Sequence, residues 1–490
     1  MSRVLVVGGG VSGLAAAHRL RTLLGPDAEL LVVEAARALG GKLAALEIGG
    51  RRVDVGAEAF LARRPEAGER IAELGLDDQL VHPGPAASGL RVGGRTVGLP
   101  PRTVMGVPGD PDVAAEALSP AGLAALRADR PGDWEPGGDV AVGALVRARL
   151  GDEVADRLVD PLLGGVYAGH ADGLGLRATV PALAAALDAD PRSLLAAARA
   201  CLPAPPAEAA PPVATGAPSS TPGRAPVFGT LRGGLADLPA TLALAARADL
   251  RLGRTVTALA RTPHGWRAEI ADAAPVEADA VVLAVPAPAV RRLLADHAPD
   301  AARAAGEIEL ASSALVVLAL PAAAAAPLAG RSGVLVGAGE RRPDGLPWTI
   351  KATTFSSEKW PHLAPGDPAD PDATAVLRLS IGRHGDPASL AALRRDDDDL
   401  VSAARSDLAA LTGIEEVPVE SAVVRWPGGL PQYGVGHLDR VAAIEDGVAA
   451  LPGLAVAGAA LHGVGVPACL ATADAAARRV AEHLAATTAP

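Results

Sequence analysis

The sequence is poor in cysteine, lysine and aromatic residues. Its two cysteines, Cys201 and Cys469, are far apart and lack metal-ligand spacing, so the sequence predicts neither a disulfide framework nor a metal site. Aromatic residues make up 2% of the 490 residues, and lysine occurs only as Lys42, Lys351 and Lys359. The formal net charge of −11 excludes nucleic acid as a partner, because phosphate neutralisation needs a basic surface. An anionic ligand would need a local group of cations.

The sequence also lacks a long hydrophobic run. The longest, Ala314–Gly330, contains two prolines and is shorter than the roughly 20 residues of a membrane-spanning helix. We interpret it as a strand followed by a loop. The apolar strand Arg3–Val7 runs directly into glycines, without the basic region or cleavage site of a signal peptide. We therefore expect a cytoplasmic protein with at most peripheral membrane contact.

The order of elements predicts a layered α/β fold. A strand, a glycine turn, a helix and a second strand follow one another from Arg3 to Glu34. Apolar strand-like runs return at Ala280–Val285 and Leu454–Ala457, and a helical pattern covers Pro467–Leu484. The length exceeds what one core usually holds, so we expect several units built from non-contiguous segments.

The glycine turn carries a dinucleotide-binding pattern. Gly8, Gly10 and Gly13 form Gly-x-Gly-x-x-Gly after the first strand and at the start of a helix, and Glu34 ends the next strand. The glycines let the backbone approach a pyrophosphate, and the helix N-terminus supplies amide donors. Glu34 is placed to accept hydrogen bonds from ribose hydroxyls. The sequence therefore predicts a bound dinucleotide.

Two further observations argue against a nicotinamide as the electron acceptor and for a flavin as the cofactor. A second nucleotide site is missing, because the best other candidate, Gly337-Ala338-Gly339, has Arg342 where the third glycine belongs. Near the end of the chain, a strand ends at Gly458, and Gly465 and Val466 precede a helix. A helix N-terminus at that point would stabilise the negative charge of a reduced flavin. We expect reoxidation by molecular oxygen or a quinone.

Several segments resemble the Gram-positive type of coproporphyrinogen III oxidases, in the protoporphyrinogen oxidase family of the FAD-containing amine-oxidase superfamily. The resemblance covers nearly the whole chain. It rests on Gly40-Gly41-Lys42, on Asp54 to Glu58, on Phe60 to Glu66, on Asp160 to Gly169, on Leu174 to Thr179, on Gly229 to Leu235, on Trp360-Pro361-His362, on Trp426 to His437 and on Gly463 to Pro467.

The resemblance implies the cofactor contacts residue by residue, with Val256 meeting the adenine through its backbone. Side-chain contacts near the C-terminus carry over less well, because Ala459 stands where relatives often have Asn. The predicted cofactor-binding residues are Gly8, Gly10, Val11, Ser12, Gly13, Glu34, Ala35, Gly40, Gly41, Lys42, Gly56, Ala57, Val256, Gly458, Gly465 and Val466.

The resemblance also implies three domains. Residues 101–202 carry amphipathic helical patterns, which predict a helical domain that contacts the membrane in some relatives. The stretch 203–226 is rich in Pro and Ala, and we predict a disordered loop there. We assign residues 1–82, 225–300 and 426–490 to a Rossmann-like FAD-binding domain, and residues 83–100 and 301–425 to a mixed-sheet substrate domain.

The implied reaction is the six-electron oxidation of coproporphyrinogen III by oxygen in haem biosynthesis, with three molecules of hydrogen peroxide formed. The resemblance also implies a ferrochelatase as the downstream partner. Aromatisation drives such a reaction, so we nominate no catalytic acid or base. The protein must position an anionic macrocycle, and we predict substrate contacts from Arg63, Arg64 and Lys351 and from Tyr167, which we place in a glycine-bounded turn.

Three alternatives stay open at this point. Protoporphyrinogen IX differs from coproporphyrinogen III by two vinyl groups in place of two propionates, and the sequence separates these substrates poorly. A flavin amine oxidase would share the nucleotide pattern but needs an aromatic cage, for which the chain offers few aromatic residues. A non-catalytic flavoprotein that carries a porphyrin would retain the same motifs.

Overall fold

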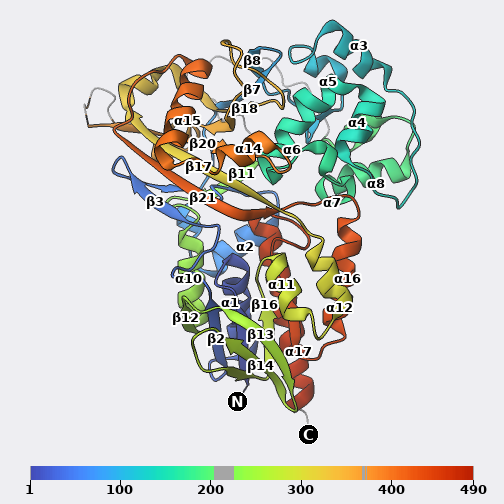
Figure 1. Cartoon of the computed structure of the whole chain (residues 1–490), viewed down its shortest axis with the longest axis vertical. Helices are drawn as coiled ribbons and strands as arrows, with labels where there is room; N and C mark the ends of the chain where they lie inside the picture. Colours follow the sequence, from blue (N-terminus) through green and yellow to red (C-terminus); the bar gives the residue numbers. More distant parts are fainter. Residues whose placement is uncertain (1, 204–225, 367–369, 371, 489–490) are drawn as a thin grey trace, which may run out of the picture.

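The computed structural model describes residues 2–203, 226–366, 370 and 372–488. Figure 1 shows an elongated molecule in which the two ends of the chain lie together, below a broad upper part made of a large sheet and a group of helices. Of the predicted loop at 203–226, residues 204–225 lie outside the described residues.

The lower part is built on a five-stranded parallel sheet whose strands come from the start, middle and end of the chain. Its residues alternate between two cores. Val4, Val6 and their neighbours face helices α1, α10 and α17, whereas Leu5 and Val7 face helices α11, α12 and α16 and a small three-stranded sheet. The strand order is β12 (Asp249–Leu252), β2 (Glu29–Glu34), β1 (Arg3–Val7), β16 (Ala280–Leu283) and β22 (Leu454–Val456), and the helices are α1 (Val11–Leu24), α10 (Asp237–Ala246), α17 (Val466–Thr488), α11 (Ala287–Leu294), α12 (Pro299–Gly306) and α16 (His437–Ala449).

The upper part contains a seven-stranded mixed sheet. All of its neighbouring strands are antiparallel except β18 and β7. One strand, β21, runs past the predicted boundary at residue 425 and stays in this sheet as far as Pro431. The strand order is β21 (Glu420–Pro431), β17 (Leu310–Pro321), β20 (Thr374–Ile381), β19 (Ile350–Thr354), β18 (Arg331–Val336), β7 (Ala87–Val92) and β8 (Arg95–Gly98).

The two faces of this sheet serve different purposes. One face packs on helix α15 (Asp397–Thr412) through residues such as Val316 and Leu318. The other face, with Leu315 and Val317, turns toward a hairpin of the lower part. That hairpin consists of β3 (Ala45–Ile48) and β4 (Arg51–Asp54). The mixed sheet therefore covers the end of the parallel sheet at which the parallel strands terminate.

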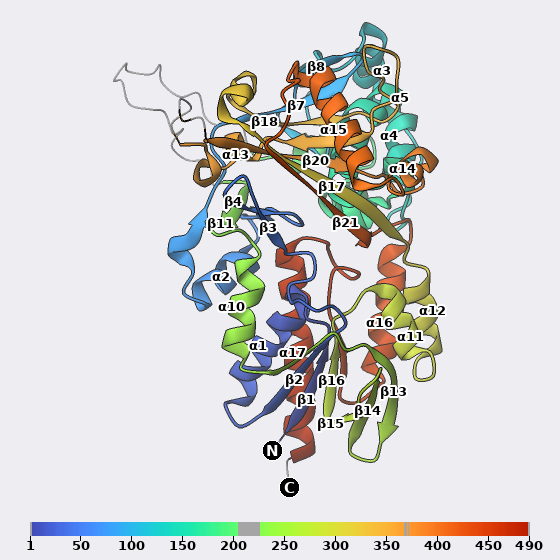
Figure 2. The same cartoon turned by 60° about the vertical axis from the view of Figure 1, so that its left-hand side comes forward.

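A group of helices lies beside the mixed sheet in both views (Figures 1 and 2). These helices share one hydrophobic core that also takes in Tyr167 and Tyr433. A short π-helical stretch, Ala155–Val159, leads directly into α6. The helices are α3 (Pro120–Ala128), α4 (Val142–Leu150), α5 (Asp152–Val154), α6 (Asp160–Tyr167), α7 (Leu176–Thr179), α8 (Pro181–Ala189) and α9 (Leu194–Ala200).

Short elements connect these parts. Across the described residues, no helix is both long and apolar enough to span a bilayer. The remaining strands are β5 (Phe60–Leu61), β6 (Leu80–Val81), β9 (Thr103–Val104), β10 (Val107–Pro108), β11 (Phe228–Leu231), β13 (Val256–Thr262), β14 (Gly265–Ile270) and β15 (Val276–Ala278); the remaining helices are α2 (Pro65–Glu73), α13 (Ser356–Lys359) and α14 (Pro387–Ala392); and short 3-10 turns cover Asp77–Gln79, Pro111–Ala114, Ala171–Gly173, Ala322–Leu328 and Pro361–Leu363.

Candidate active site

The turn between β1 and α1 is shaped to admit a ligand. Gly8 has a positive φ of 110°, and a Cβ on Gly13 would lie 1.9 Å from the carbonyl oxygen of Gly8, so a side chain at either position would break the turn. A Cβ on Gly10 would meet nothing within 4 Å. Gly10 is also the N-cap of α1, and no side chain caps this helix. The first amides of α1 therefore remain available to an anion.

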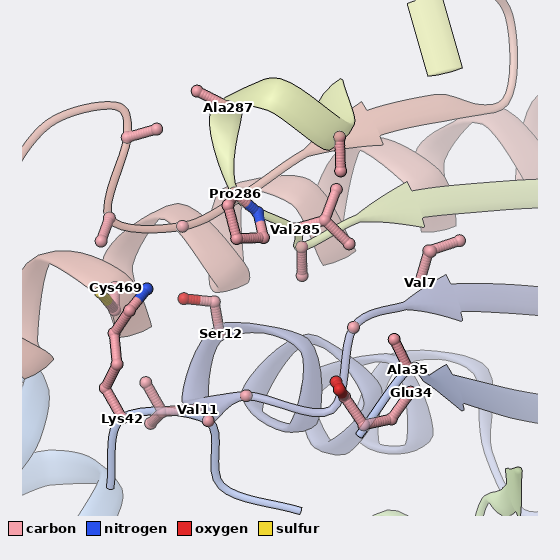
Figure 3. A pocket seen from close by; sticks show the side chains of 18 of the residues that line it. Val7, Val11, Ser12, Glu34, Ala35, Lys42, Val285, Pro286, Ala287 and Cys469 are labelled. Carbon is pink, nitrogen blue, oxygen red and sulfur yellow. The ribbon is translucent and has the colours of Figure 1, made fainter. Parts of the chain in front are cut away.

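Glu34 holds the far side of the same turn. Its carboxylate accepts hydrogen bonds from the amide of Gly9 at 2.6 Å and from the amide of Ala36 at 2.7 Å. The side chain lines the cavity beside Ala35, as Figure 3 shows. Glu34 is thus held by the backbone at the position where the dinucleotide pattern requires an acceptor for ribose hydroxyls.

At the other end of this cavity lies the loop before α17. The amide of Gly458 donates to the Thr472 hydroxyl at 3.1 Å, which ties the loop to the helix. In Figure 3 the Lys42 amine projects into the cavity toward Ser12 and Cys469. Burial raises the pKa of the Cys469 thiol. The N-terminus of α17 and the Lys42 amine therefore both bring positive charge to this end of the cavity.

We call this space the glycine-turn cavity. Three predicted cofactor residues do not line it. Gly13 lies beneath the turn in α1, Gly56 lines a second cavity, and Gly465 stands between the lining residues Val464 and Val466. The predicted residues that do line it are Gly8, Gly10, Val11, Ser12, Glu34, Ala35, Gly40, Gly41, Lys42, Ala57, Val256, Gly458 and Val466.

The residues fit FAD. The cavity runs from Glu34 and Val256 at one end, past the uncapped helix, to the loop before α17, which is the order adenosine, pyrophosphate, flavin. The open space at Gly10 is the observation that favours a bound phosphate over an unliganded turn. The Val256 carbonyl accepts from Arg292 at 3.0 Å, and a contact between Val256 and adenine stays a prediction.

A second cavity adjoins the first under the mixed sheet. The two share Lys42, Ala57 and Val464, so they meet at the flavin end. We call it the lysine cavity because all three lysines of the chain line it. Its walls also include the apolar side chains of Leu315, Leu335 and Trp426. An apolar space with gathered cations suits a hydrophobic molecule that bears carboxylates.

Two of the cations in the lysine cavity share a single carboxylate. One oxygen of Glu58 lies 3.0 Å from Lys359 and 3.0 Å from Arg378, and the other accepts from the Ser356 hydroxyl. Burial alone would raise the pKa of Glu58, but Arg378 and Lys359 lower it to about 2. Arg378 also donates to the Gly56 carbonyl at 2.7 Å. This Glu58 cluster keeps one positive charge in excess.

The predicted substrate residues have different positions. Lys351 lines the lysine cavity. Arg63 and Arg64 line neither cavity, and Arg64 forms an exposed ion pair with Glu66 at 2.6 Å. Their contact with substrate stays a prediction.

Tyr167 ends helix α6 and does not lie in a turn. The preceding glycine pair, Gly164 and Gly165, suggested a turn. In the structure, Gly164 instead lets the Arg383 side chain approach helix α6 closely. A Cβ on Gly164 would lie 2.5 Å from the Arg383 guanidinium. Tyr167 faces the helical core, where burial raises its pKa to about 12.

Two charged residues of the site were absent from the prediction. Arg378 was missed although it is the single charged residue of β20, a mostly apolar strand that is buried on both faces. A charged residue in such a strand indicates a nearby partner of opposite charge, because a fully buried charge needs a partner. Glu58 was noted only as part of a cofactor motif. Across the described residues, no group of three or more His, Cys, Asp and Glu is placed to hold a metal ion.

Comparison with known proteins decides the family. Residues 11–481 match the model of flavin containing amine oxidoreductases. The chain belongs to this family. Like its relatives, it is an FAD-dependent oxidoreductase with a Rossmann-like α/β fold.

Three similar relatives carry the same name. Coproporphyrinogen III oxidase of Mycobacterium tuberculosis strain H37Rv is 43% identical over 98% of this chain and 97% of its own length. The enzyme of the same name from Mycobacterium leprae is 42% identical over 96% of each chain. That from Bacillus subtilis is 29% identical over 95% of each.

Solved structures agree on the fold of this flavoprotein. A crystal structure from Exiguobacterium sp. 255-15, provisionally described as a protoporphyrinogen oxidase, superposes with a TM-score of 0.82 at 29% identity and covers 98% of this chain and 99% of its own. Cyclohexylamine oxidase from Brevibacterium oxydans, at 15% identity and a TM-score of 0.67 over 99% of each chain, shares the fold.

Proposed function

We propose that this flavoprotein oxidises coproporphyrinogen III to coproporphyrin III in haem biosynthesis. The observation that carries the proposal is the lysine cavity, which is lined by Lys42, Lys351, Lys359 and Arg378 and adjoins the flavin end of the glycine-turn cavity. A chain with a net charge of −11 and three lysines has placed all three where an anionic substrate would lie. The name that the relatives from Mycobacterium tuberculosis, Mycobacterium leprae and Bacillus subtilis have in common supports the same substrate.

The reaction removes six electrons, so it takes three rounds of two-electron oxidation. FAD, when bound, supplies the acceptor for a hydride from a meso carbon in each round, and the pyrrole nitrogens lose protons. The chain's own residues position the macrocycle against the flavin. Leu315 and Trp426 offer apolar walls, and the Glu58 cluster offers its excess positive charge to propionates.

The cofactor contacts predicted from the sequence are part of this proposal. The amides at the start of α1 hold the pyrophosphate, and Glu34 holds a ribose. Lys42 and the N-terminus of α17 stabilise the negative charge of the reduced flavin. We further propose that oxygen is the acceptor. A nicotinamide is disfavoured, because Gly337-Ala338-Gly339, the best other candidate for a nucleotide site, leads into a turn and not into a helix. A ferrochelatase is the proposed recipient of the product, and the cytoplasm, with peripheral membrane contact, is the proposed location.

The test is a comparison of substrates. The purified protein is supplied with FAD and either coproporphyrinogen III or protoporphyrinogen IX, and porphyrin fluorescence and oxygen consumption are followed together. We expect faster oxidation of coproporphyrinogen III, with three oxygen molecules consumed per porphyrin formed. A higher kcat/KM with protoporphyrinogen IX would reassign the substrate. A rate no higher than the autoxidation blank, with porphyrin still bound, would indicate a carrier. Oxidation of amines such as cyclohexylamine would indicate an amine oxidase.

A further inference from the structure

Lys351 occupies an irregular position in the mixed sheet. In the pairing of β19 with β20, Ile350 lies opposite Ile381, but Ala352 lies opposite Ser380. A regular antiparallel ladder would place Ser380 opposite Lys351, so Lys351 is the extra residue of a β-bulge. A bulge re-aims the side chain that it carries, and bulges are common beside active sites.

The bulge directs Lys351 into a buried place without a counter-ion. The residue is 7% exposed, and its amine donates one hydrogen bond, at 3.3 Å, to the Gly164 carbonyl of α6. Within the described part of the chain, no carboxylate forms an ion pair with it. The Arg383 guanidinium acts on the Lys351 amine by charge repulsion, and Arg383 itself donates to Asp160 at 3.0 Å and to the Val336 carbonyl at 2.8 Å.

The carboxylates of Asp160 and Glu58 already have cationic partners. Asp160 accepts from the Ala171 amide as well as from Arg383 and lies 3.3 Å from His170. Glu58 is bound by Lys359 and Arg378. Burial, assisted by Arg383, lowers the pKa of Lys351 to about 7. In the ligand-free protein the Lys351 amine is therefore largely neutral at slightly alkaline pH.

Lys351 and the Glu58 cluster are separate cation sites in one cavity. Thr354 pairs with Arg378, and Lys351 lies three residues from Thr354 along β19, or roughly 10 Å at the rise of an extended strand. This spacing is on the scale of a tetrapyrrole ring. In coproporphyrinogen III every pyrrole carries a propionate, whereas in protoporphyrinogen IX the two propionates stand on neighbouring pyrroles.

We propose that Lys351 is the residue that selects a tetracarboxylate over a dicarboxylate, by binding a propionate that only coproporphyrinogen III can offer once the Glu58 cluster holds another. This inference rests on the proposed function. The neutral amine takes up one proton from solvent as the carboxylate arrives, and an ammonium–carboxylate ion pair results. The dicarboxylate leaves Lys351 neutral and without a partner.

The first experiment compares both substrates in Lys351→Met, Lys351→Arg and Lys359→Met. We expect Lys351→Met to lower kcat/KM for coproporphyrinogen III by about 10- to 100-fold and to change that for protoporphyrinogen IX by less than about twofold. Lys351→Arg should recover part of the loss. Lys359→Met is the matched control, because it removes a cation that both substrates use and should lower both values. An equal loss for both substrates in Lys351→Met would overturn the proposal.

The second experiment does not need turnover. Calorimetric binding of coproporphyrin III at pH 8, in buffers of different ionisation enthalpy, should show uptake of one proton by the wild type and none by Lys351→Met. Equal uptake in the two proteins would overturn the proposal, even if the wild type oxidises neither porphyrinogen. The latter result would refute the proposed function separately.

Thermal unfolding of the ligand-free proteins gives a third reading. The folded pKa of Lys351 is below its ordinary value of 10.5, so the wild type loses stability as pH falls from 10.5 to about 7. Lys351→Met should therefore be the more stable protein near pH 6, with the difference shrinking toward pH 10. A constant difference across this range would contradict a neutral buried amine.

Discussion

Tyr167 and Tyr433, the two tyrosines of the chain, pack against each other in the helical core with ring centroids 5.4 Å apart and planes tilted by 48°. The Tyr433 hydroxyl donates to the Ala459 carbonyl at 2.6 Å. Its ring also stacks on His437 at a centroid distance of 3.8 Å. Tyr433 thus joins the helical part to the loop at the flavin end of the glycine-turn cavity.

Tyr433→Phe should destabilise the protein and loosen the flavin. The change leaves the Ala459 carbonyl without this donor, which typically costs about 1–3 kcal/mol of unfolding free energy. Urea unfolding and the ratio of flavin to protein absorbance measure the two effects. Tyr167→Phe is the control, because the Tyr167 hydroxyl has no hydrogen-bond partner among the described residues. An equal effect in both variants would contradict a specific role for the hydroxyl of Tyr433.

Glu34→Ala should weaken FAD retention without removing activity at saturating FAD. The variant loses the acceptor for ribose and also frees the amides of Gly9 and Ala36, so the Kd for FAD should rise by at least about 10-fold. Fluorescence titration of the apoprotein with FAD checks this. Glu47→Ala, which removes an exposed carboxylate of β3, should leave the Kd unchanged. Unaltered FAD affinity in Glu34→Ala would remove Glu34 from the cofactor site.

The lysine cavity predicts which cations matter to the substrate. Lys359→Met should raise KM for coproporphyrinogen III at least about fivefold, because it removes one of the two cations on Glu58. Arg64→Met tests the substrate contact predicted for Arg64. A rise in KM comparable to that of Lys359→Met would support the contact, and a change of less than about twofold would leave Arg64 in its exposed pair with Glu66. Steady-state kinetics at two salt concentrations compare the pair. A larger effect at Arg64 would show that it leaves Glu66 to reach the substrate.

Glu58 predicts a loss of stability in acid. Its folded pKa of about 2 lies below the ordinary 4.5, so the folded state binds fewer protons than the unfolded state between these values. The contribution of Glu58 to the stability of the folded state is complete above pH 4.5 and declines as pH falls toward 2. The stability advantage of wild type over Glu58→Gln should therefore shrink from pH 6 to pH 3 in urea unfolding.

The stability of the wild type is compared with that of Glu58→Gln because Asp54, a neighbour of Glu58, titrates in the opposite sense. Burial raises the pKa of Asp54 to about 6 despite hydrogen bonds from the amides of Leu235 and Ala236. The contribution of Asp54 to the stability of the folded state is therefore more favourable at low pH. An advantage of wild type over Glu58→Gln that stays constant with pH would contradict the depressed pKa of Glu58.

The sequence predicted the α/β fold and the flavin cofactor because their signals are local. Gly8 to Gly13 and Glu34 need only a strand, a turn and a helix in order to mark a nucleotide site. The helix predicted at Pro467–Leu484 is α17, Val466–Thr488. Such features depend on neighbours within a few residues, and their periodicity can be read directly.

The substrate side could not be read in the same way. Arg378 meets Glu58 only through a sheet that joins distant strands, and Lys351 points into the cavity because of a one-residue bulge that no pattern marks. Tyr167 was misplaced because Gly164 and Gly165 look like a turn when Arg383 is not in view. Register and long-range contact decide these positions, and neither follows from local propensity.

The parallel sheet has a consequence for the order of events during synthesis. Its last strand, β22, and the helix α17 are made after nearly all the rest of the chain, yet Leu470 and Ala477 of α17 share a core with Leu14 of α1. A nascent chain therefore leaves the part of α1 that packs on α17 uncovered until these late segments have been made. The glycine-turn cavity is also completed only then, because Gly458, Val466 and Cys469 form its flavin end.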